Sequence, residues 1–80
     1  MNLEHGDDQN NYYNRLRLLE YALVDTLVAI EQGMNEDDAF SHWGGRENYR
    51  EIMLTYYVVE RGMSPEMAAQ EIGHITKGRL

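Results

Sequence analysis

Apolar residues recur every three or four positions along the first half of the chain, which is the spacing of one helix face. The stripe consists of Leu16, Leu19, Leu23, Leu27, Ile30 and Met34. It is widened by Leu18, Ala22, Val24, Val28 and Ala29, which indicates contacts with more than one neighbouring helix. An asparagine at position 10, 11 or 14 can cap the start, and Gly33 can take the left-handed conformation that ends helices. The pattern predicts a first helix from between residues 11 and 15 to Gln32.

A second stripe predicts another long helix from about Arg46 to Arg61. Its apolar residues are Tyr49, Ile52, Tyr56, Val59 and Met63. A shorter helix is expected after each long one, because Asn35 and Ser64 are both good N-caps. Gly44-Gly45 ends the first short helix, and in the second Met67, Ala68 and Ile72 are expected to pack inward before Gly73 ends it. The sequence therefore predicts an all-α fold of four helices, in the order long, short, long, short.

The two long–short pairs repeat one sequence pattern. Residues 30–39 align with residues 59–68, so that Gly33 falls on Gly62, and upstream Thr26 falls on Thr55. Each copy contains a long helix, a Gly-Met hinge, a capping residue and a short helix. We therefore expect two tandem helical hairpins that share one core, with hinges at Gly33 and Gly62.

The chain has 80 residues, which is enough for one domain. Residues 1–10 are polar and acidic and predict a flexible N-terminal tail, which leaves residues 11–80 as the single helical domain. A domain of this size is only marginally stable by itself, and the chain has no cysteine for a disulfide. Two repeats also bury less surface than a longer array, so we expect a homodimer.

The balance of charge is strongly acidic. Fourteen acidic residues against seven basic ones give a formal net charge of −7, which disfavours generic binding to nucleic acid or to an anionic membrane. No segment approaches the roughly 18 consecutive apolar residues that a membrane span needs. The polar, acidic N-terminus does not resemble a signal peptide. These features favour a cytoplasmic protein without a membrane partner.

The sequence contains no recognisable catalytic, cofactor or metal-binding pattern. Ser64 is explained as a helix cap, and the adjacent side chains of Ser41 and His42 point about 100° apart on a helix. Gly44-Gly45 lacks the Lys-Ser/Thr pair of a phosphate-binding loop. The three histidines are far apart in sequence, at His5, His42 and His74. We therefore expect a non-enzymatic protein with no cofactor and no metal.

Aromatic and acidic residues are the candidates for contact with a protein partner. Aromatic side chains with a polar tip are enriched at interfaces, and this chain has six tyrosines and one tryptophan. Trp43 ends a short helix beside two glycines, which can leave one ring face exposed, although core packing is the alternative. The strongest acidic cluster, residues 36–38, is also explained by the positive end of a helix dipole. The candidate partner-binding residues are Tyr12, Tyr13, Glu36, Asp37, Asp38, Trp43 and Tyr57.

These observations predict a small protein-interaction module that binds and modulates a larger protein partner. One version of this hypothesis is an acidic inhibitor that covers the nucleic-acid-binding surface of its target, as small proteins of mobile elements do. A structural or assembly protein with open-ended association is a further possibility.

The alternative function is a helix-turn-helix transcriptional regulator that binds DNA. Residues 35–43, the Gly44-Gly45 turn and the helix from residue 46 have the outline of this motif. In that hypothesis Arg46, Asn48 and Arg50 contact bases or phosphates. The net charge opposes DNA binding, and the acids at positions 47 and 51 can pair with the arginines.

Overall fold

The structure is a computed structural model that describes the backbone of residues 3–80 and the side chains of residues 15–80. It contains the four helices α1 (Leu3–Glu31), α2 (Glu36–Ser41), α3 (Arg46–Thr55) and α4 (Pro65–Ile75). A π-helical segment, η1 (Tyr56–Glu60), continues α3. Residues 3–80 contain no strand. The predicted all-α fold with four helices is therefore confirmed.

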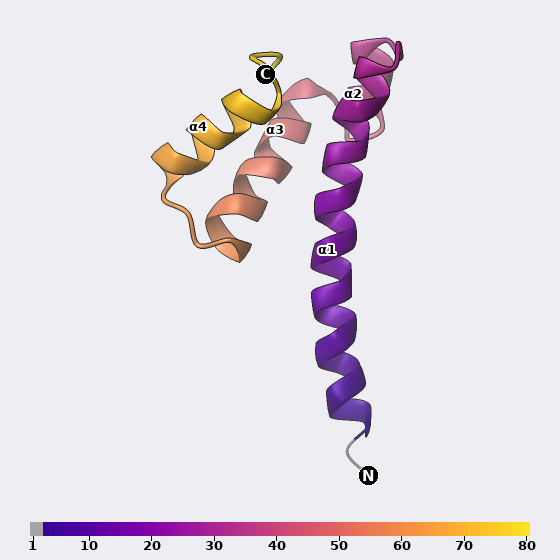
Figure 1. Ribbon diagram of the computed structural model, residues 1–80, viewed down its shortest axis with the longest axis vertical. Helices are drawn as coiled ribbons and strands as arrows, with labels where there is room; N and C mark the ends of the chain where they lie inside the picture. Colours follow the sequence, from indigo (N-terminus) through magenta and orange to yellow (C-terminus); the bar gives the residue numbers. More distant parts are fainter. Residues whose placement is uncertain (1–2) are drawn as a thin grey trace.

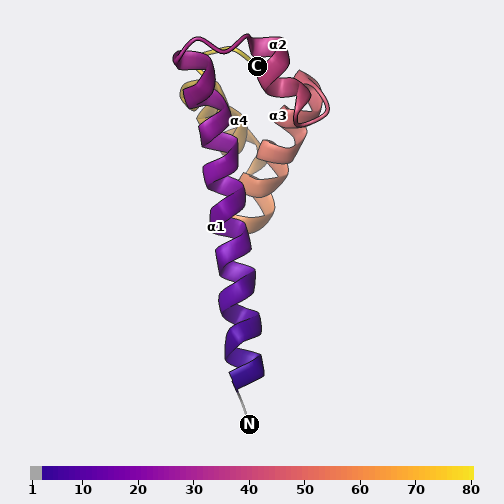
Figure 2. The same cartoon turned by 90° about the vertical axis from the view of Figure 1, so that its right-hand side faces the viewer.

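Helix α1 is the longest element, and the other helices gather around its C-terminal half. Figures 1 and 2 show its N-terminal half projecting beyond α2, α3 and α4. Helix α2 packs against α1 and α3, while α4 packs against α3 and η1. The resulting particle is elongated, with extents of 49 × 27 × 19 Å.

Helix α1 starts at Leu3, ahead of the predicted start between residues 11 and 15. Acids in the first turns of a helix interact favourably with its dipole, and the sequence has Glu4, Asp7 and Asp8 there. These acids favour a start of α1 ahead of the asparagines at positions 10, 11 and 14, which were the predicted caps. The flexibility of residues 1–10 stays a prediction.

One core joins α1, α2, α3, η1 and α4. Its buried apolar side chains are Leu23, Leu27, Ile30, Ala39, Phe40, Tyr49, Met53, Tyr56, Tyr57, Ala68 and Ile72. Tyr49 and Met53 are fully buried, and the Tyr49 hydroxyl donates a hydrogen bond of 2.5 Å to the Leu23 carbonyl on α1. Thr76 is buried as well and donates to the Ile72 carbonyl at 2.6 Å. Buried polar groups thus receive the partners that burial requires.

The two predicted N-caps are confirmed. The Asn35 side chain accepts a hydrogen bond from the Asp38 backbone N–H at 3.2 Å, and Ser64 accepts from the Met67 N–H at 3.2 Å. Each bond satisfies a backbone donor that the first turn of a helix leaves without a partner.

The two glycines expected at the hinges both have positive φ. Gly33 has φ of 111° and Gly62 has φ of 70°, conformations that glycine adopts without a Cβ clash. They lie in the connections that follow α1 and η1. Whether the two halves form a tandem repeat stays a prediction.

The buried face of α3 and η1 differs from the predicted stripe. Tyr57 was expected away from the helical stripe, but its side chain is only 8% exposed. Val59 was expected on the stripe and is instead 66% exposed. Met53 is fully buried and precedes Tyr57 by one helical turn, so the buried face runs through Tyr49, Met53 and Tyr57 rather than through Val59. The interpretation of Tyr57 as a surface residue is therefore wrong.

Two expectations for the last helix are also wrong. Met67 is 59% exposed rather than packed inward, because Ala68 and Ile72 supply the buried face of α4. Gly73 does not end the helix, which continues to Ile75. The chain turns only where Lys77 and Gly78 take positive φ, and the Gly78 N–H then bonds to the Gly73 carbonyl at 3.1 Å.

Alanine substitutions at two glycines are expected to have opposite effects on stability. Gly73 lies inside α4, so Gly73→Ala should raise the free energy of unfolding by about 0.5–1 kcal/mol. Gly45 precedes α3 with φ of 111° and ψ of 169°, a region that only glycine occupies readily, so Gly45→Ala should lower it by about 1–3 kcal/mol.

The two variants are matched, since an added Cβ would meet nothing within 4 Å at either position. The difference between them therefore reports backbone conformation alone. Thermal unfolding followed by circular dichroism measures it. A lower melting temperature for Gly73→Ala than for Gly45→Ala would contradict the assignment of the helix end.

Candidate functional site

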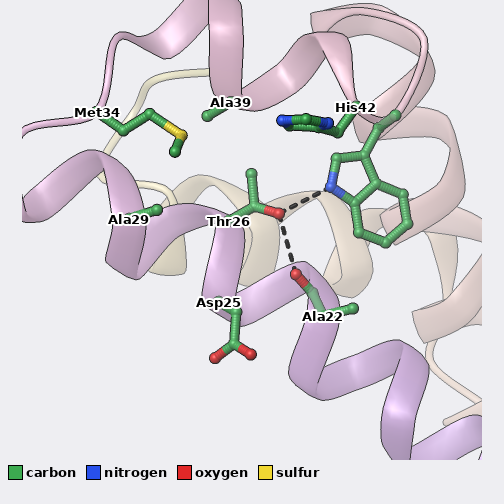
Figure 3. Close-up of a pocket in the computed structure, with 8 residues that line it drawn as sticks. Ala22, Asp25, Thr26, Ala29, Met34, Ala39 and His42 are labelled. Carbon is green, nitrogen blue, oxygen red and sulfur yellow. Dashed lines mark hydrogen bonds between the residues drawn. The ribbon is translucent and has the colours of Figure 1, made fainter.

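An open apolar groove lies between α1 and α2. We call it the Trp43 groove; its volume is about 430 Å³, and it is lined by Ala22, Asp25, Thr26, Ala29, Met34, Ala39, His42 and Trp43. Figure 3 shows α1 on one side and α2 with the loop after it on the other. The alanines on α1 and α2 have small side chains and leave the space between the two helices open. Met34 and Trp43 supply the larger apolar surfaces of the groove.

The Trp43 indole is held in place at one end of the groove. Its Nε1–H donates to the Thr26 hydroxyl at 2.7 Å, and that hydroxyl donates to the Ala22 carbonyl at 3.0 Å (Figure 3). The indole also meets the Tyr49 ring edge-on, with centroids 5.7 Å apart. Trp43 is partly buried, so it belongs in part to the core and in part to the groove. A ring fixed on both sides is pre-organised for a contact.

Two polar residues lie at the edge of the groove. His42 is exposed and lines the groove from the side opposite Thr26 (Figure 3). The Asp25 carboxylate points away from Met34 and His42, toward the outer side of α1 (Figure 3). The lining that faces the space is therefore mainly apolar.

The acids of residues 36–38 do not form one patch, because ion pairs hold two of them. Glu36 lies 3.2 Å from the Arg46 guanidinium and 3.5 Å from that of Arg79. Asp37 lies 3.4 Å from Arg46, yet its side chain is 90% exposed. Asp38 is exposed and forms no ion pair with residues 15–80. Asp38 precedes His42 by one helical turn, so it lies on the same side of α2 as the groove.

The same ion pairs attach the C-terminal tail to the other helices. Glu31 accepts from Lys77 and Arg79 at 3.0 Å each, and Arg46 donates to the Arg79 carbonyl at 2.8 Å. The hydrogen bond from Lys77, followed by that from Arg79, lowers the pKa of the Glu31 carboxyl. Exposed pairs contribute little one by one, but a network fixes the tail over the ends of α1 and α2.

The candidate tyrosines are placed in different ways. The side chains of Tyr12 and Tyr13 lie outside the described residues. Tyr57 is buried against Tyr56, with ring centroids 5.4 Å apart, so it is no surface contact of this chain. Burial raises the pKa of both phenols, and the nearby Glu20 raises them further. The Tyr56 hydroxyl donates to Glu20 at 3.1 Å.

The residues proposed for DNA contact are largely occupied within the protein. Arg46 pairs with acids on α2 and lies 5.2 Å from the centroid of the Phe40 ring. The Asn48 amide donates to the Trp43 carbonyl. Arg50 is exposed and forms no ion pair with residues 15–80. Only one of the three side chains thus remains free to meet a phosphate.

Within residues 15–80, no three His, Cys, Asp or Glu side chains come close enough together to hold a metal ion. None of the described helices has the length and apolar character required to cross a membrane.

Sequence reasoning singled out Trp43 but missed the rest of the groove. Ala22, Thr26 and Ala29 form a line of small residues on α1, and this spacing was the available signal. Their partner across the groove, Met34, was assigned to the helical stripe and is instead 46% exposed after the helix ends.

The fold and the groove define a small all-α protein with an open apolar surface beside a fixed tryptophan. No protein-family model, no curated protein and no solved structure matches the chain.

Proposed function

We propose that the protein is a non-enzymatic interaction module that binds and modulates a larger protein partner. In this proposal it acts in the cytoplasm as a homodimer, and each subunit consists of two tandem helical hairpins. The observation that carries the proposal is the Trp43 groove, an apolar and open space beside an indole that hydrogen bonds already hold in position. Grooves between helices with a rigid aromatic wall are a common form of protein recognition site.

The charges of the described residues favour a basic partner. Four basic side chains, Arg46, Arg61, Lys77 and Arg79, are already paired with carboxylates. Within residues 15–80, the exposed acids without an ion pair include Asp25, Asp38, Glu47, Glu51 and Glu66. The net charge is −7. Such a field attracts and orients a positively charged surface.

The occupant that fits is a protein segment with an apolar side chain next to a lysine or arginine. The apolar side chain enters the space between Met34 and Trp43, and the cation lies at the edge near Asp38. A nucleic-acid-binding surface presents basic side chains of this kind, so inhibition of a nucleic-acid-binding protein is the version that the charge supports.

A groove-blocking substitution tests this proposal. Ala22 is exposed and lines the groove, so Ala22→Arg places a long charged side chain beside Trp43 without opening the core. Ala69→Arg on α4 is the matched control, because Ala69 is also an exposed alanine in a helix. The tagged wild type and both variants are used to capture partners from a lysate of the native host, with nuclease added to half of each sample.

The expected result is one protein that survives nuclease with the wild type and with Ala69→Arg, and whose recovery falls at least about tenfold with Ala22→Arg, the change that one 1.4 kcal/mol contact makes. Equal recovery with Ala22→Arg would remove the groove from the interface. Recovery of DNA together with proteins that disappear after nuclease would favour the DNA-binding regulator instead.

A further inference from the structure

The outer face of α1 carries large apolar side chains that residues 15–80 leave at least partly exposed. Leu18, Tyr21, Val24 and Val28 are 64%, 56%, 39% and 43% exposed. Their spacing of three and four residues places them along one side of the helix, over about 15 Å of its length. Contiguous exposed apolar surface on a small protein marks an interaction site.

Most of this outer face lies apart from the Trp43 groove, and the two surfaces adjoin at Asp25, which also lines the groove. Successive helical residues turn by about 100°, so Tyr21 and Val28 point away from Thr26, whose hydroxyl holds the indole in the groove. The Asp25 carboxylate also points outward (Figure 3). A contact centred on Tyr21 therefore reaches the groove only at Asp25 and does not involve Met34, His42 or Trp43.

The charges on this face are arranged symmetrically about Tyr21. Arg17 precedes Tyr21 by four residues, and Asp25 follows it by four, so all three lie on one side of the helix. Both charged side chains are exposed, and neither forms an ion pair with residues 15–80. Reversing the direction of the helix exchanges the two charges, so the face is complementary to an antiparallel copy of itself.

We infer that this face joins two copies of the chain, with their α1 helices antiparallel about a two-fold axis at Tyr21. Arg17 of each copy then meets Asp25 of the other, and Leu18 meets Val24. A parallel pair would instead place Arg17 against Arg17 and Asp25 against Asp25, which repels. Contacts of this two-fold kind are typical of homodimers.

The projecting half of α1 fits this arrangement. Figures 1 and 2 show that half extending past the other helices, so in an antiparallel pair each projecting half runs beside the domain of the second copy. The contact thereby becomes longer than the exposed side chains alone suggest. This inference rests on the homodimer in the proposed function, while the groove is argued independently of it.

Charge reversal across the two-fold axis tests the inference by sedimentation equilibrium. The wild type is expected to be a dimer. Arg17→Asp places Asp against Asp, and Asp25→Arg places Arg against Arg, so the dimer dissociation constant should rise at least about tenfold in each variant alone. An equimolar mixture should regain the dimer mass, because each contact then joins opposite charges.

The same charge changes on α3 serve as controls. Arg50→Asp and Glu47→Arg alter exposed residues of α3 and should leave the dimer unchanged. A wild type that is monomeric at its highest soluble concentration would overturn the inference, as would a mixture that stays monomeric or single variants that dimerise normally. Capture with Ala22→Arg is scored separately, so loss of the dimer and loss of the groove interaction are distinguishable.

Discussion

Tyr49→Ala is expected to remove a large share of the free energy of unfolding. The Tyr49 ring is fully buried and lies 4.9 Å from the Phe40 ring and 5.7 Å from the Trp43 indole, measured between centroids. Removing a buried aromatic ring lowers the free energy of unfolding by about 3–5 kcal/mol. A domain of this size has only about 4–12 kcal/mol in total, at 0.05–0.15 kcal/mol per residue.

Urea unfolding followed by far-ultraviolet circular dichroism measures this loss, and Tyr49→Phe separates its two parts. Phenylalanine keeps the ring but removes the hydroxyl that donates to the Leu23 carbonyl, so it should lower stability by about 1–3 kcal/mol. Tyr49→Ala should lower it further. A wild-type midpoint for Tyr49→Ala would show that α3 does not pack through this side chain.

The second large effect is expected at alkaline pH. Burial raises the pKa of Tyr49, Tyr56 and Tyr57 above the ordinary value of about 10. The unfolded chain loses these protons near pH 10 while the folded protein still holds them. The free energy of unfolding is therefore unaffected by these groups below about pH 10 and falls as the pH rises from there toward the folded pKa values.

Urea midpoints across the alkaline range measure this dependence, together with the absorbance of tyrosinate. The double variant Tyr56→Phe and Tyr57→Phe should show a shallower fall, because it has fewer buried phenols to ionise. Tyrosinate that forms fully before the helical signal is lost would contradict the burial of these side chains.

Local signals in the sequence predicted much of the fold. The caps Asn35 and Ser64 are side-chain hydrogen bonds to residues three positions away, so sequence alone contains them. The start of α3 at Arg46 follows from the glycines before it, which take positive φ. The buried face of α3 and η1 was missed because Met53 was not placed on the stripe, although Tyr49, Met53 and Tyr57 recur at the four-residue spacing of one helix face. Gly73 was wrongly expected to end α4, because a glycine ends a helix only where the following chain turns.

The candidate site was predicted only in part. Trp43 was found because its position at the end of a short helix, beside two glycines, can leave one ring face exposed, but the groove exists only where α1 and α2 meet. Thr26 and Met34 contribute to it through contacts that no local pattern encodes. The acids Glu36 and Asp37 were identified by their clustering, whereas their pairing with Arg46 depends on how α3 returns toward α2.

The most direct test of the groove as the partner site is photo-cross-linking in the native host. A photoreactive amino acid replaces His42, which is exposed at the edge of the groove, or Gln70, which is exposed on α4. We expect one protein adduct from position 42, insensitive to nuclease, joined to a segment with an apolar residue beside a lysine or arginine. Position 70 should give none. An equal adduct from position 70, or cross-links from position 42 to nucleic acid alone, would contradict the proposed function.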